Sequence, residues 1–135
     1  MSLFQTESRL HDHGLLILRV AFGLCIMFGH GLGKVTRLFS GGEIEFADPF
    51  GFGPAVSLGL AAFAEVICAS LLILGLLTRA ALIPLLVVVA TALFAVHIDQ
   101  PFGQQERPLL FACAFIALLL TGPGRFSLDA LIWKR

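Results

Sequence analysis

Apolar residues gather in four long runs that short polar segments separate. The runs cover about residues 14–35, 54–77, 80–98 and 107–121. A helix needs ~20 residues to cross a ~30 Å hydrocarbon core, and the first three runs are near that length. The fourth is shorter unless its polar start is drawn into the helix. The pattern predicts an all-α fold: an integral membrane four-helix bundle.

The segments between the runs contain residues that end helices. Residues 48–54 read Asp-Pro-Phe-Gly-Phe-Gly-Pro, and residues 122–124 read Gly-Pro-Gly. The short turn at residues 77–79 predicts an antiparallel hairpin of the second and third runs. Ser127 then begins a short segment with an apolar face, which predicts an interfacial helix. We find no linker or repeat, so residues 1–135 are expected to form a single domain.

Composition supports a membrane protein. The chain is 58% hydrophobic and 13% charged, about half the charge of a soluble domain. Its net charge is zero and no Lys/Arg cluster occurs, which disfavours nucleic-acid binding. Cys25, Cys68 and Cys113 lie in separate runs without a CxxC pair. This argues against a dithiol redox centre or a thiolate metal site, and predicts three apolar thiols inside the bundle.

The basic residues near the ends of the runs predict the orientation. Four spans put both termini on one side. That side collects Arg9, Arg79, Arg125, Lys134 and Arg135. The opposite loops hold Lys34, Arg37 and Arg107 beside most of the acids. The excess of Lys and Arg places both termini in the cytoplasm. The polar residues 1–13 are expected to form no more than a short interfacial turn.

One carboxylate lies deep in an apolar run. Glu65 is about halfway along the second run, where an ionisable group costs at least ~2.5 kcal/mol. Small residues lie one helical turn from it on either side, at Ala61, Cys68 and Ala69. We therefore expect Glu65 to face other helices and to have a compensating partner on one of them.

Helix counting brings further polar groups to a similar depth. At ~1.5 Å per residue, His30 and His97 lie at nearly the same level toward the outer face. Lys34 is one turn beyond His30, and Glu106 opens the fourth run on that side. The prediction is a polar site in the outer half of the bundle, with Glu65 as its deepest member. Each of these groups also has a purely structural interpretation, as a packed, protonated or solvated side chain.

The first run has two further features. Arg19 lies near its inner end, where the side chain is expected to reach toward the lipid headgroups. It is retained as a ligand-binding candidate, although it lies on the other side from the predicted site. Gly29 and Gly33 form a GxxxG pair, and Gly23 adds another small position. These glycines predict close approach of a neighbouring helix.

Several motifs follow one another in a specific order from residue 14 onward. They are GLLILR at 14–19, His30-Gly31 with Lys34, Ala64-Glu65, LILGLLTR at 72–79, His97, Glu106 and GPGRFSLD at 122–129. In this order they resemble the DoxX family. The resemblance implies a four-helix integral protein of the bacterial inner membrane. The family name comes from a subunit associated with a quinol oxidase or thiosulfate–quinone oxidoreductase, and most members have no assigned reaction.

One departure from the family pattern is visible. Glu106 is followed by Arg107-Pro108, where members usually continue with small apolar residues and then a tyrosine. This chain has no tyrosine, and Phe111 stands near that place. A role for a phenol there therefore does not carry over.

The favoured interpretation is a redox-associated subunit that binds a quinone in an apolar slot near the outer leaflet. His30 or His97 would bind a quinone carbonyl, Glu65 and Glu106 would relay protons, and Lys34 would hold the anionic intermediate. A partner subunit would supply electrons, because the sequence shows no redox centre of its own. Whether the chain catalyses a reaction by itself, and whether it forms homo-oligomers, stays open.

Two other classes of function stay open. A haem or metal protein would use His30 and His97 as ligands at matching depth. The HxxxH and ExxH spacings of a dedicated metal site on one helix are missing, so no metal site is predicted. A non-catalytic assembly or small-solute transport component would use the buried polar groups for packing or passage.

Overall fold

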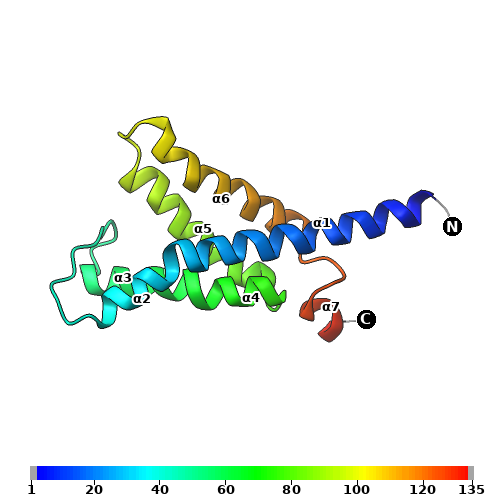
Figure 1. Cartoon of the computed structure of the whole chain (residues 1–135), viewed down its shortest axis with the longest axis horizontal. Coiled ribbons are helices and arrows are strands. Elements are labelled where there is room, and N and C mark those ends of the chain that lie inside the picture. The colour runs from blue at the N-terminus through cyan, green and yellow to red at the C-terminus, as the bar shows by residue number, and fades with distance from the viewer. Residues whose placement is uncertain (1–2, 134–135) are drawn as a thin grey trace.

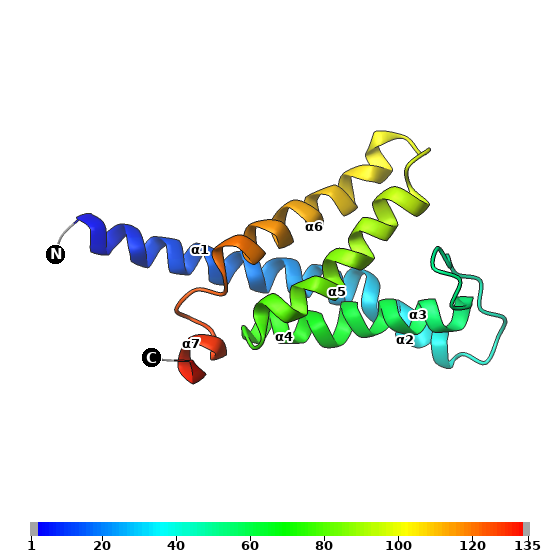
Figure 2. The same cartoon turned by 180° about the vertical axis from the view of Figure 1, so that it is seen from behind.

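The computed structural model describes residues 3–133, and this part of the chain is helical without strands (Figures 1 and 2). Three rods each contain a π-helical turn, labelled η. The first is α1 (Leu3–Ile26), η1 (Met27–Gly31) and α2 (Leu32–Phe39). The second is α3 (Pro54–Phe63), η2 (Ala64–Cys68) and α4 (Ala69–Leu74). The third is α5 (Thr78–Thr91) and η3 (Ala92–Val96). The fourth rod is the single helix α6 (Phe102–Thr121), and a short helix, α7 (Leu128–Ile132), follows it.

The ends of the rods follow from local chemistry. Pro54 occupies the first position of α3, where its missing N–H costs nothing. Gly75 ends α4 in the left-handed conformation, with φ 70°. Gly122 follows α6 with φ 83°. The Ser127 hydroxyl accepts a 3.1 Å hydrogen bond from the Ala130 N–H, which caps α7. The predicted Pro54 start, Gly-Pro-Gly stop and Ser127 cap are therefore confirmed.

The first two rods lie side by side and antiparallel, while α5 and α6 form a hairpin that diverges from them (Figures 1 and 2). We call the end that holds the first turns of α1, the α4–α5 turn and α7 the inner end. The outer end holds the loops at residues 40–53 and 97–101. All four rods approach one another near the inner end and separate toward the outer end.

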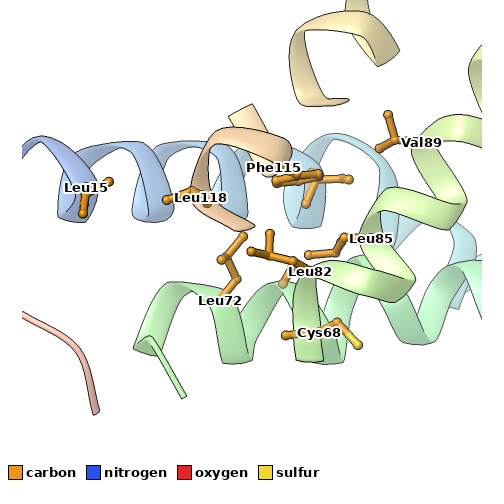
Figure 3. Close-up of a cluster of buried hydrophobic side chains, with 11 residues drawn as sticks. Leu15, Cys68, Leu72, Leu82, Leu85, Val89, Phe115 and Leu118 are labelled. Carbon is orange, nitrogen blue, oxygen red and sulfur yellow. The ribbon is translucent and has the colours of Figure 1, made fainter. Parts of the chain in front are cut away.

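The core lies where the four rods meet. Leu72, Leu82, Leu85, Phe115 and Leu118 have no exposed surface, and they come from α4, α5 and α6 (Figure 3). Leu15 and Ile26 of α1 also belong to this cluster, as do Cys68, Ala69, Ala81 and Val89. Burial of such side chains stabilises the fold by about 1.5–3 kcal/mol each in water, and in a bilayer by packing alone. This cluster therefore lies where the rods converge, and the connecting loops of the outer end lie beyond it.

Three helices are long and apolar enough to cross a membrane: Glu7–Phe39, Pro54–Leu74 and Thr78–Val96. The protein is therefore a membrane protein whose helices contact the lipid bilayer. The fourth rod, α6, has 20 residues but begins with a polar stretch that includes Glu106 and Arg107. The fourth span and the orientation of the termini stay predictions. Lys134 and Arg135, which entered the orientation argument, lie outside the described residues.

Two expectations about this fold are wrong. The helix begins at Leu3, not near residue 14, because no proline or glycine interrupts residues 3–13 and the first turns extend the membrane helix. Residues 1 and 2 lie outside the described part. Of the three thiols expected inside the bundle, only Cys68 is buried. Cys25 and Cys113 are exposed on the surface of apolar helices.

Candidate functional site

The structure pairs Glu65 with Lys34. Glu65 lies in η2 and is 4% exposed, and its Oε2 lies 2.5 Å from the Lys34 Nζ of α2. In the described part of the chain this is the single ion pair. The lysine is the compensating partner that the position of Glu65 required. Because both side chains are largely buried, separating them would leave an uncompensated charge.

Gly31 brings the first two rods close enough for this pair. A Cβ atom at Gly31 would lie 2.8 Å from the Glu65 carbonyl oxygen and 2.9 Å from the Val66 Cγ2, so only glycine fits. Gly29 and Gly33 have nothing within 4 Å, so the prediction that they form the packing face is wrong. The π-helical turn η1 contains one residue more per turn than an α-helix, and this moves the contact to Gly31.

A cavity of about 960 Å³ opens beside the ion pair at the outer end. The two histidines predicted at this level, His30 and His97, both line it, together with Lys34, Glu65 and Arg107. These five residues come from all four rods, in parts of the chain that are far apart in the sequence. The volume lies at the upper end of the usual range for small-molecule sites, ~300–1,000 Å³. The arrangement can hold an apolar molecule and offer it several hydrogen-bond donors and acceptors.

Aromatic side chains form much of the cavity wall. Phe111 of α6 lies with its ring centroid 6.0 Å from that of His30, edge to face. The Phe111 ring also contacts Phe22 at 5.6 Å and Phe115 at 5.8 Å, which connects the wall to the core. His97 ends the third rod, and its Nδ1 lies 2.7 Å from the Gln100 Oε1. Both imidazoles are thus oriented by neighbours while facing the cavity.

The loop at residues 40–53 covers one side of the cavity. The Asp48 carboxylate accepts hydrogen bonds from the Ser57 hydroxyl at 2.7 Å and from the N–H groups of Phe52 and Gly53. The Ser57 hydrogen bond is the main cause that lowers the pKa of Asp48, so this carboxylate stays charged. Phe50 and Phe52 stack at 5.9 Å, and both line the cavity. Asp48 therefore fixes an aromatic cover on this side.

Not every predicted residue reaches the site. Glu106 is exposed on α6 and is absent from the cavity wall, whereas its neighbour Arg107 lines it. One residue along a helix rotates the side chain by about 100°, so the two point in different directions. Arg107 and the aromatic residues of the loop line the cavity although they were not predicted as site residues. The phenylalanines at 46, 50 and 52 were a usable signal, because aromatic residues gather at membrane interfaces.

Arg19 lies at the opposite end of the bundle. It is 1% exposed, and its Nη1 and Nη2 donate to the carbonyl oxygens of Pro123 and Phe126 at 2.5 and 2.6 Å. The expectation that it reaches toward headgroups is wrong, because these carbonyls hold the guanidinium inside the protein. Gly75 leaves room for it, since a Cβ there would lie 2.7 Å from Nη1. Arg19 is not among the residues that line the outer cavity.

Asp129 of α7 completes this inner-end network. Its carboxylate accepts hydrogen bonds from the N–H groups of Leu77 at 2.7 Å and Thr78 at 2.9 Å. Its own N–H donates to the Gly75 carbonyl at 2.8 Å. Burial alone would raise the pKa of Asp129, but the hydrogen bonds and the charge of Arg19 lower it overall. These contacts attach α7 to the turn between α4 and α5.

Histidine, cysteine and acidic side chains do not gather for a metal ion. Across residues 3–133, no group of three or more such residues could hold one. The cavity instead offers two imidazoles and two carboxylates, Glu45 and Glu65, of which Glu65 is already bound to Lys34. The donor set suits hydrogen bonding to an organic ligand better than coordination of a structural metal ion.

The fold and the site together define a class: small helical membrane proteins with a largely apolar cavity, bordered by polar groups, at one end of the bundle. The sequence profile of DoxX matches residues 14–98, and the chain belongs to the DoxX family. It is 33% identical to an uncharacterized protein of Haemophilus influenzae over 127 residues, which are 89% of this chain and 83% of the relative.

The match to a second relative covers a smaller part of both chains. The chain is 38% identical over 85 residues to an uncharacterized membrane protein of Mycobacterium tuberculosis, covering 53% of this chain and 52% of that protein. No solved structure matches. The predicted family resemblance is therefore confirmed, while the reaction has to be argued from the cavity.

Proposed function

We propose that the protein is a quinone-binding, redox-associated subunit of the bacterial inner membrane. The observation that carries the proposal is the outer-end cavity, in which His30, His97 and the Lys34–Glu65 pair share a space walled by aromatic rings. A quinone head has a flat apolar ring and two carbonyl oxygens. It therefore needs both an aromatic slot and hydrogen-bond donors.

The proposed roles follow from the contacts. His30 or His97 would donate a hydrogen bond to one carbonyl, and Lys34 would stabilise negative charge as the ring is reduced. Glu65 would exchange protons with the ligand, because its partner Lys34 can hold it charged until a proton arrives. Glu106 would act only as a more distant proton relay, since it lies outside the cavity wall.

Complete reduction of a quinone takes two electrons and two protons. The described residues offer groups for the protons, and a partner subunit would supply the electrons. In this proposal α6 forms the fourth span, residues 1–135 form one domain, and both termini lie in the cytoplasm. The cavity then opens toward the outer leaflet.

A second candidate function is a non-catalytic assembly or transport component. The observation that favours it is the closure of Glu65 on Lys34 at 2.5 Å, in a contact that only Gly31 permits. Such a pair can specify how two helices dock without binding any ligand. A haem protein is the less favoured alternative.

The candidate functions are distinguished by the small molecule that co-purifies with the protein. The protein in mild detergent is extracted with organic solvent, and the extract is examined by mass spectrometry for quinones. Glu65→Gln is expected to lose the quinone while keeping its helical circular dichroism. Glu7→Gln, the same change at an exposed position of α1, is expected to retain it.

Two outcomes would contradict the quinone function. Quinone retained at wild-type levels in Glu65→Gln, or absent from the wild-type protein after quinone has been supplied, favours the assembly function. A Soret band in the absorbance spectrum of the purified protein would favour haem instead.

A further inference from the structure

A second pocket lies at the inner end, between the first turns of α1 and α7. Its volume is about 530 Å³. Its polar lining consists of Arg9, Asp12, His13 and Arg125, and Phe126 and Leu131 supply apolar wall. This pocket lies at the opposite end of the bundle from the proposed quinone cavity and shares no residue with it.

The pocket has an excess of positive charge. Arg9 and Arg125 are exposed, and neither has a carboxylate within ion-pair distance in the described part of the chain. The acid in the wall, Asp12, is 8% exposed, and its Oδ1 accepts a hydrogen bond from the Arg125 N–H at 3.1 Å. Asp12 thus positions the backbone of the second arginine. Two guanidinium groups remain available for an anion.

His13 is the third basic residue that lines the pocket. Its Nδ1 lies 2.6 Å from the Arg9 carbonyl oxygen, and its ring packs on Phe126 with centroids 4.8 Å apart. The carbonyl can only accept, so Nδ1 carries a proton and Nε2 is left for a ligand. Nε2 donates only when the imidazole takes up a second proton, so the arginines are the permanent donors.

The depth of the pocket matches the headgroup layer. The helix from Glu7 to Phe39 has 33 residues and is therefore about 50 Å long, well beyond the ~30 Å hydrocarbon core. Its first turns must project into the headgroups. Beside them Leu131, Ile132 and Trp133 are 61–67% exposed, which suits a segment lying in the membrane interface.

We propose that this inner-end pocket binds the phosphate-bearing head group of an anionic phospholipid. The arginines would hold the phosphate, and the acyl chains would lie along Leu131 and Phe126. Basic pockets beside membrane helices commonly take anionic lipid headgroups. A free phosphate ion could use the same donors, but it would leave the apolar wall uncovered, so the lipid fits the whole pocket better.

The experiment uses the full chain in nanodiscs of phosphatidylcholine with increasing phosphatidylglycerol. Lipid that stays bound after gentle release is counted by native mass spectrometry. Wild-type protein is expected to retain phosphatidylglycerol selectively. Arg125→Gln and Arg9→Gln are each expected to weaken this retention about fivefold, the loss of one basic contact at a membrane surface.

Arg79→Gln is the matched control, because Arg79 is also exposed at the inner end but lies outside the pocket. It is expected to retain the lipid. The proposal would be overturned if Arg79→Gln weakened the retention of phosphatidylglycerol as much as the pocket variants do. It would also be overturned if the wild-type protein retained phosphatidylcholine as strongly as phosphatidylglycerol. Displacement of the lipid by millimolar inorganic phosphate would also overturn it in favour of a simple phosphate site. Unchanged melting of all variants in pure phosphatidylcholine shows that the folds are comparable.

Discussion

The two ends of the bundle use buried charge in different ways. At the inner end, Arg19 and Asp129 direct their hydrogen bonds to backbone carbonyl and N–H groups at two connections, the α6–α7 loop and the α4–α5 turn. At the outer end, Lys34 and Glu65 bond to each other and also face a cavity that His30 and His97 share. Charge satisfied by backbone fixes a fold, whereas charge that borders a cavity remains able to meet a ligand. The buried charges of the inner end therefore hold the fold together, whereas those of the outer end border the cavity that is proposed to bind a ligand.

The largest expected effect comes from removing the inner-end cation. Arg19→Met keeps a similar volume but removes the donors that the carbonyl oxygens of Pro123 and Phe126 have in the native protein. We expect the free energy of unfolding to fall by about 3 kcal/mol, the loss of two charge-assisted hydrogen bonds. Denaturant titration in detergent, followed by circular dichroism, measures it. Arg79→Met, at an exposed position of the same end, should change it by less than about 0.5 kcal/mol. A comparable fall in the free energy of unfolding in both variants would contradict a structural role for Arg19.

The next effect concerns the outer-end ion pair. Lys34→Met leaves the Glu65 carboxylate buried without its cation, and we expect a loss of about 2 kcal/mol. Combining it with Glu65→Gln should restore most of this stability, because a neutral pair carries no unpaired charge. The double variant should still fail to retain quinone. A double-mutant cycle measured by thermal unfolding gives the coupling, and purely additive losses would contradict the pairing.

A third test compares two glycines of the same π-helical turn. Gly31→Ala places a methyl group against the Glu65 backbone, which cannot move without separating the helices. It should cost about 1–3 kcal/mol. Gly29→Ala meets nothing within 4 Å and should be neutral or stabilising by up to about 1 kcal/mol. Both are read from melting curves in one detergent. A larger loss for Gly29→Ala would mean that another molecule packs on that face.

The smallest effect is the pH dependence at Asp129. The hydrogen bonds and Arg19 lower its pKa in the folded protein, so the unfolded chain binds its proton first as the pH falls. Its stabilisation is present above the unfolded value of about 3.9 and is lost as the pH falls through the lower folded value. Asp129→Asn should therefore cost about 1 kcal/mol at pH 7 and almost nothing in strong acid. Unfolding measured from pH 7 to pH 3 checks this, and a constant difference across that range would contradict it.

The sequence allowed several of these features to be predicted because membrane depth can be counted along a helix. The partner for Glu65 and the shared level of His30 and His97 came from that count. The direction in which a side chain points around the helix axis was harder to predict than its depth. Buried positions on the first rod advance through Leu15, Arg19 and Ile26, and then step by five residues to Gly31.

That irregular step is the π-helical turn, and no residue type marks it in the sequence. Because the sequence does not reveal this turn, Gly29 and Gly33 were predicted to form the helix contact that Gly31 makes. The exchange of Glu106 for Arg107 is also an error of direction around the axis, but α6 contains no π-helical turn, and a shift of a single position decides which side chain faces the cavity. The inner-end role of Arg19 was missed for another reason. Its partners are main-chain carbonyls about a hundred residues away, and any sequence can supply such carbonyls.

The short apolar part of α6 has a consequence for the surrounding lipid. Residues 108–121 are about 21 Å long as a helix, less than the ~30 Å of the hydrocarbon layer. If α6 spans as proposed, lipids beside it must compress, and the compression falls at the outer end, where its polar residues begin. Headgroups and water would then lie unusually close to Arg107 and the mouth of the cavity. A ligand could enter from this thinned patch without crossing a full leaflet.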